Sequence, residues 1–169
     1  MKRRDFVVTG LAGGSGLVWA APAKVQTLSD ARMWLDQMEK APGAKTTGAW
    51  PLVAVLEHLS QSIEMSLDGF PQPKSAAFQH TIGAAAFAVF QWRGKMSHGL
   101  DEPIPGAPAL TTQGDWKPAA NRLRTAMARF EGHTGPLKPH FAYGALSKSE
   151  FAQAHVFHIA NHQDEIVVG

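Results

Sequence analysis

Apolar residues recur with helical spacing in five segments of the chain. The clearest stripe lies in residues 52–67 and consists of Leu52, Val55, Leu56, Leu59, Ile63 and Leu67. Residues 28–40, 75–93, 118–130 and 147–166 show the same i, i+3, i+4 recurrence. Because no segment alternates convincingly between apolar and polar residues, strands are not expected. The pattern predicts an all-α protein of five helices.

Local signals mark where several of these helices begin. Pro51 and Pro118 suit a first helical turn, and Ser75 suits a helix cap. Ser147 and Glu150 form the S-x-x-E pattern of a capping box. The helix after Ser75 is expected to bury Phe78, Ile82, Ala85, Ala86 and Val89. Connectors over residues 94–116 and 132–146 complete a predicted helical bundle, where a site would lie between facing helices.

The first 23 residues, MKRRDFVVTGLAGGSGLVWAAPA, have the pattern of an export signal. A basic start containing Arg3-Arg4 precedes a weakly apolar, glycine-rich stretch and an A-x-A cleavage site ending at Ala23. The arginine pair resembles a bacterial twin-arginine signal. We therefore expect a signal peptide over residues 1–23, export by the twin-arginine machinery to the periplasm, and one domain over residues 24–169. No stable membrane anchor is expected after cleavage.

Composition narrows the chemistry of any site. The chain has no cysteine, which excludes disulfides, thiolate ligands and cysteine nucleophiles. Without residues 1–23 it carries 13 basic and 13 acidic residues, so its basic pI gives no support for a nucleic-acid partner. A transition-metal site would therefore depend on histidine.

Three histidines lie on one face of the last predicted helix. His158 and His162 are four residues apart, which places both imidazoles on the same side of the helix. His155 shares this sector with Phe151 and Ala154, so the face is expected to be buried. A metal ion shared by His158 and His162 is one interpretation. Satisfied polar groups in a core are the other.

Three stretches carry a family resemblance. WPLVAVLEHLSQSIEMSLDGFP (50–71), RGKMSHGLDEPIPGAP (93–108) and PHFAYGALSKSEFAQAHVFHIANHQDEI (139–166) together resemble an uncharacterised domain-of-unknown-function family of the DinB-like superfamily. This resemblance covers roughly residues 28–166 and implies a DinB-like four-helix bundle with an additional helix and long connectors. It also implies a metal site made by one histidine of the second helix and an H-x-x-x-H pair of the last, here His58, His158 and His162. The helical wheel alone places His58 beside the main apolar stripe rather than on it.

The other histidines have lesser expected roles, and two positions depart from the family pattern. Asn161 and Gln163 stand where the family often has histidine and arginine, which could alter substrate contacts but changes no ligand. His155 is expected to support the site or the core, His140 to lie at its edge, and His98 to be exposed to solvent. His80 and His133 give no signal. Glu57 and Asp164, next to ligands in sequence, are candidates to steady them.

The resemblance implies a divalent metal ion, with zinc and nickel favoured over iron and manganese. Three neutral imidazoles would leave its charge available to polarise a substrate oxygen or sulfur. We therefore expect an exported metal-dependent enzyme, hydrolase- or thiol-transferase-like, acting on an unknown small-molecule substrate. The alternative is a non-catalytic domain that binds metal or a small molecule. The catalytic residues are unknown, and the exposed bundle faces leave room for a homodimer.

Overall fold

The computed structural model describes residues 23–169. The expected signal peptide, all but its last residue, lies outside the described part of the chain. Within the described part, every helix is too short or too polar to cross a membrane.

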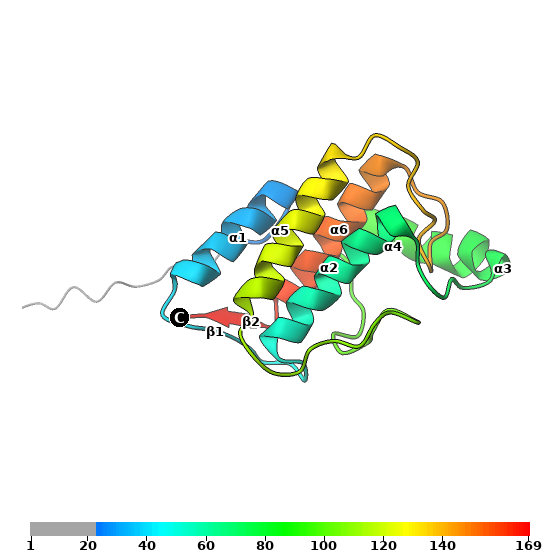
Figure 1. Cartoon of the computed structure of the whole chain (residues 1–169). Coiled ribbons are helices and arrows are strands. Elements are labelled where there is room, and N and C mark those ends of the chain that lie inside the picture. The colour runs from blue at the N-terminus through cyan, green and yellow to red at the C-terminus, as the bar shows by residue number, and fades with distance from the viewer. Residues whose placement is uncertain (1–22) are drawn as a thin grey trace, which may run out of the picture.

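Four helices pack side by side into a bundle (Figure 1). They are α1 (Leu28–Lys40), α2 (Leu52–Asp68), α5 (Lys117–Gly132) and α6 (Lys148–Gln163). Their inward faces meet in one apolar core, to which all four helices contribute. The largest completely enclosed side chains of that core include Trp34, Phe130 and Phe151. The predicted helical bundle is confirmed.

The start of α6 is set by local hydrogen bonds. The Ser147 side chain accepts a hydrogen bond from the Glu150 backbone N–H, and the Glu150 carboxylate accepts one from the Ser147 backbone N–H. This predicted capping box satisfies two backbone donors that the first helical turn leaves unpaired. The capping box thus defines the N-terminal end of α6, the helix that carries three of the histidines.

A further helical segment lies outside the core and runs through α3 (Ala76–Phe78), a π-helical turn η1 (Gln79–Gly83) and α4 (Ala84–Arg93). Ser75 caps it as predicted. The prediction of its buried face was wrong, because Ile82 and Val89 are 63% and 46% exposed. Phe87 is buried instead and stacks on Tyr143. This segment packs on the connector before α6, through Phe87 and Gly83, and is joined to α6 by the Gln91–Gln153 hydrogen bond, so the apolar stripe did not identify its contact face.

Two short strands add a feature that the apolar pattern did not predict. β1 (Ala44–Thr46) pairs with β2 (Ile166–Val168) in antiparallel register. No strand had been expected, and the last helix had been expected to continue to residue 166. Three-residue strands are too short to show an alternating pattern. Because α6 ends at Gln163, Glu165 lies in the turn that follows the helix, three residues after His162.

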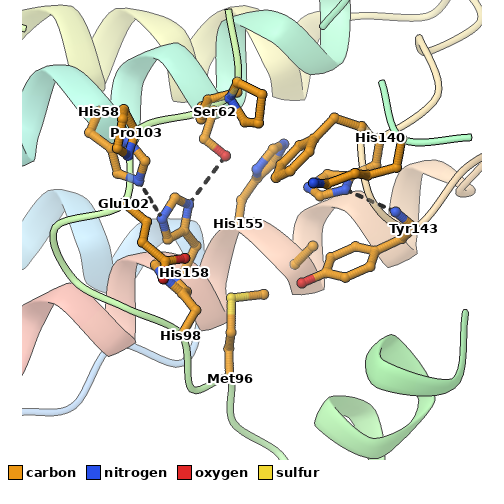
Figure 2. A pocket seen from close by; sticks show the side chains of 15 residues that line it. His58, Ser62, Met96, His98, Glu102, Pro103, His140, Tyr143, His155 and His158 are labelled. Atoms are coloured by element: carbon orange, nitrogen blue, oxygen red, sulfur yellow. Dashed lines mark hydrogen bonds between the residues drawn. The ribbon is translucent and has the colours of Figure 1, made fainter. Parts of the chain in front are cut away.

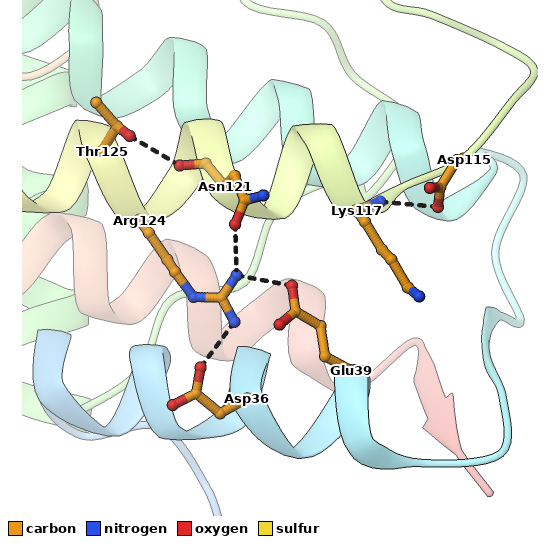
Figure 3. Close-up of polar contacts among 7 residues, drawn as sticks. All are labelled: Asp36, Glu39, Asp115, Lys117, Asn121, Arg124 and Thr125. Atoms are coloured by element: carbon orange, nitrogen blue, oxygen red, sulfur yellow. Dashed lines mark hydrogen bonds and ion pairs between the residues drawn. The ribbon is translucent and has the colours of Figure 1, made fainter.

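The outer surfaces of α1 and α5 are joined by Arg124 (Figure 3). Its guanidinium donates to Asp36 at 2.7 Å and to Glu39 at 2.9 Å on α1. It also donates to Asn121 Oδ1 at 3.1 Å, one turn earlier on its own helix. Planar guanidinium geometry allows one side chain to make all three bonds.

Candidate metal centre

His58 of α2 meets His158 and His162 of α6 in the interior of the bundle. One ring nitrogen from each histidine lies within 4.8 Å of the others. The ring centroids are 4.8 Å apart for His58 and His158, 5.2 Å for His58 and His162, and 5.0 Å for His158 and His162. The three predicted ligands therefore come together, and the buried cluster they form could hold a metal ion.

Burial keeps all three imidazoles neutral. Loss of solvent lowers the pKa of His58 to about 4 and that of His162 to about 3. The pKa of His158 is also lowered, first by burial and then by the neighbouring histidines. A neutral imidazole has one nitrogen with a free lone pair, which is the form that binds metal.

His162 is oriented by a buried carboxylate. Its Nδ1–H donates to Glu165 Oε1 at 2.7 Å. This bond places the proton on Nδ1 and leaves Nε2 with its lone pair, and within the described chain that buried nitrogen has no hydrogen-bond partner. A carboxylate behind a histidine is the usual way to fix a metal ligand.

Gly48 makes room for this carboxylate. A Cβ atom at position 48 would collide with Glu165 Oε2. Burial raises the pKa of the Glu165 carboxyl, and the charge of Asp101 raises it further. Glycine at position 48 thus lets a carboxyl group occupy an enclosed place beside a ligand.

The other two histidines are held differently. His158 Nδ1 lies 3.2 Å from Ser62 Oγ, so a donated Nδ1–H again leaves Nε2 for the centre (Figure 2). His58 Nε2 and His158 Nε2 are 3.0 Å apart. Two imidazole nitrogens bound to one zinc ion lie about 3.3 Å apart, given Zn–N bonds near 2.0–2.1 Å. This pair of donor atoms therefore fits a shared ion, and the orphaned His162 Nε2 would supply the third nitrogen.

His98 was expected to face solvent, and that expectation was wrong. The connector folds its ring against the cluster, with centroids 4.8 Å from His158 and 5.4 Å from His162. Its Nδ1–H donates to the Gly99 carbonyl at 2.6 Å. Its Nε2 is buried, and no group of residues 23–169 hydrogen-bonds it. A glycine- and proline-rich sequence indicates a loop but does not show which side of the loop covers a site.

His155 and His140 lie where supporting residues were expected. The His155 ring is buried between Phe130 and Phe151, and its Nε2 lies 3.3 Å from Ser66 Oγ. His140 is buried at the far end of the pocket beside the cluster. Neither belongs to the three-histidine group.

Glu57 and Asp164, which are adjacent in sequence to candidate ligands, do not contact the histidine cluster. The Glu57 carboxylate accepts hydrogen bonds from Thr111, and Asp164 pairs with Lys24 at the surface. The carboxylate that does contact a ligand is Glu165, which sequence reasoning missed. The one signal in the sequence is its spacing of three residues from His162, a separation at which two side chains of a helical turn can meet. Ser62 could have been found from its position four residues after His58, on the same helical face.

Comparison with known proteins gives one result that covers almost the whole described chain. A family model described as "Protein of unknown function (DUF1569)" matches residues 23–168. No curated protein gives a significant match, and no solved structure does. The resemblance to a family of unknown function is thereby confirmed. The chain, a helical bundle with a buried histidine triad, belongs to the DUF1569 family.

Proposed function

We propose that this chain is a DinB-like metal protein in which His58, His158 and His162 bind one divalent ion, zinc or nickel. The observation that carries the proposal is the convergence of three buried, neutral imidazoles on one point. Three buried histidines are costly to keep without partners, because an unsatisfied polar group in a core loses its hydrogen bonds to water. A shared ion would bind one ring nitrogen of each histidine, including the His162 Nε2 that has no partner among the described residues.

The first function we propose is that of a metal-dependent enzyme, hydrolase- or thiol-transferase-like. A pocket of about 240 Å³ reaches the centre and is lined there by His58, His98 and His158. The group of potential ligand side chains in the described residues stops at three, which supports an open fourth position. When bound, a divalent ion supplies Lewis-acid polarisation of a substrate oxygen or sulfur.

His98 has a role of its own in this proposal. Its Nδ1–H is already used by the Gly99 carbonyl, so its buried Nε2 carries a free lone pair beside the cluster. We assign it to a position beside the ion rather than to the ligand set, because it lies outside the group of three potential ligands. Replacement of His98 by alanine should therefore lower metal affinity much less than His158→Ala does, because it removes no ligand of the ion.

A second candidate is a non-catalytic domain that binds metal or a small molecule. The complete burial of His162 and its enclosed partner Glu165 supports firm retention of an ion, which is all that this alternative requires. The two candidates predict the same ion and differ in turnover.

Metal analysis of protein purified without a histidine tag tests the shared part of the proposal. We expect about one divalent ion per chain, lost in the His158→Ala and His162→Ala variants and retained in His80→Ala, a matched control at an exposed histidine. Substoichiometric metal that is unchanged in the two ligand variants would overturn it. Once metal binding is established, two assays distinguish the enzyme from the non-catalytic candidate. They measure hydrolysis of model esters and amides, and addition of thiols to electrophiles.

We also propose export to the periplasm by the twin-arginine route. This rests on the Arg3-Arg4 signal in the sequence and on the requirement that a buried metal site be folded before transport. The protein should reach the periplasm when the general secretory route is blocked, and should stay in the cytoplasm of cells that lack the twin-arginine machinery. The opposite pattern would refute the proposal. A homodimer stays a prediction, which sedimentation of the purified protein checks.

A further inference from the structure

The pocket beside the histidine cluster has a second polar end. Figure 2 shows His58 and His158 at one end and His140 and Tyr143 at the other. Between them the wall is largely apolar and includes Met96. Both distal residues come from the connector between α5 and α6, and neither has a role in the metal proposal.

His140 is held as a hydrogen-bond donor toward the pocket. Its Nδ1 accepts the backbone N–H groups of Ala142 and Tyr143, each at 3.2 Å. Burial lowers the pKa of His140 to about 3, so the ring is neutral and its one proton resides on Nε2. The residue is only 7% exposed, and within residues 23–169 the hydrogen bonds of its ring are the two at Nδ1. In Figure 2 this nitrogen points away from the backbone bonds and into the pocket.

Tyr143 adds a second donor on the same side. Its ring stacks on His140 with centroids 4.2 Å apart and an interplanar angle of 5°, and on Phe87 at 5.1 Å. Burial raises the pKa of Tyr143 to about 12, so the phenol keeps its proton. In the described chain the hydroxyl has no protein partner, and Figure 2 shows it directed into the pocket. Packing on both faces of the ring therefore presents an unpaired O–H at a fixed place.

We propose that His140 and Tyr143 form a subsite for the carbonyl oxygen of a small, mostly apolar molecule. Two neutral donors match an uncharged acceptor, whereas an anion would favour a buried cation that this end of the pocket does not contain. The charged side chains of the lining, Lys74 and Glu102, are exposed and opposite in sign. Apolar walls with a few fixed polar groups are typical of small-molecule sites.

The subsite places a limit on the substrate of the proposed enzyme. A molecule anchored by its carbonyl oxygen at His140 and Tyr143 would extend its apolar part along Met96 toward the histidine cluster. Such an orientation suits ketones, esters and amides whose second functional group lies some distance from the carbonyl. The subsite itself needs no metal, so it can be tested in the metal-free protein and can fail independently of the metal centre.

The test uses two probes of nearly the same shape, acetophenone and ethylbenzene, which differ by one carbonyl group. Tyr143 is the only tyrosine of the chain, so protein labelled with ¹³C at tyrosine Cζ gives one reporter signal. In metal-free full-length protein we expect acetophenone to bind about 3- to 10-fold more tightly than ethylbenzene, the value of one hydrogen bond. The tyrosine signal should shift with acetophenone and stay nearly fixed with ethylbenzene.

Two variants make the test specific. Tyr143→Phe removes one donor and the tyrosine reporter but keeps the stacked ring, so binding of both probes to every form is followed by ligand-observed NMR. The preference for acetophenone should fall in this variant while ethylbenzene binding is unchanged. Met96→Leu, a control in the apolar wall, should keep the preference. The proposal is overturned if acetophenone does not bind, if the two probes bind equally, or if Tyr143→Phe retains the full preference.

Discussion

The buried histidines predict a specific sensitivity to acid, and His155 isolates the effect best. Its ring is 2% exposed and lies between two phenylalanines of the core. His155 is not one of the three candidate metal ligands. Replacement by leucine keeps a similar apolar volume in that space. Ser66 retains its hydrogen bond to the Ile63 carbonyl at 2.6 Å after His155 is lost. The variant therefore removes one titratable group with little change in packing.

The magnitude follows from the two pKa values. An exposed histidine in the unfolded chain has a pKa of about 6.5, and burial lowers the pKa of folded His155 to about 3. Between these values the unfolded chain binds a proton that the folded chain does not. This stability contribution is therefore complete above pH 6.5 and is lost as pH falls toward 3, by about 1.4 kcal/mol per pH unit. From pH 7.5 to pH 5 the loss amounts to about 2 kcal/mol.

Urea denaturation of the metal-free protein in EDTA, at pH 7.5 and at pH 5, measures this difference. Wild type should lose about 2 kcal/mol more free energy of unfolding over this interval than His155→Leu does. His80→Asn serves as the control, because the His80 ring is exposed and folding removes little water from it. Equal losses in wild type and His155→Leu would show that His155 is not held neutral by burial, and the reasoning would fail.

Three further predictions concern the carboxylate behind the metal site and the bundle surface. Glu165→Gln should lower zinc affinity about 10- to 100-fold in a competition titration, because the support of His162 is weakened; unchanged affinity would argue against this support. Gly48→Ala should lower zinc affinity in the same direction by displacing the Glu165 carboxylate, whereas Gly132→Ala, where an added Cβ meets nothing within 4 Å, should not. Arg124→Ala should destabilise the fold by about 1 kcal/mol or less in low-salt urea denaturation, and by less in high salt, because its ion pairs are partly exposed.

Much of the candidate site could be predicted from the chain because helical geometry is local. A four-residue spacing is enough to place His158 and His162 on one face, and the apolar neighbours of His155 indicate that this face is buried. The third member, His58, could be chosen only through the family resemblance. It lies beside the stripe of its helix, and a single helical wheel does not show how far the helix is rotated toward its neighbours.

What surrounds the triad was decided by tertiary structure. Glu165 reaches His162 because the chain leaves α6 and pairs as β2 with a distant strand, a contact that no local pattern encodes. His98 reaches the cluster through a connector without periodicity, and its position depends on which surface that connector covers. The unexpected exposure of Ile82 has the same cause, since an apolar stripe shows that a helix can bury a face but not that a partner is present. The spacing of residues along one helix thus determines which side chains can act together, and long-range packing determines which groups they meet.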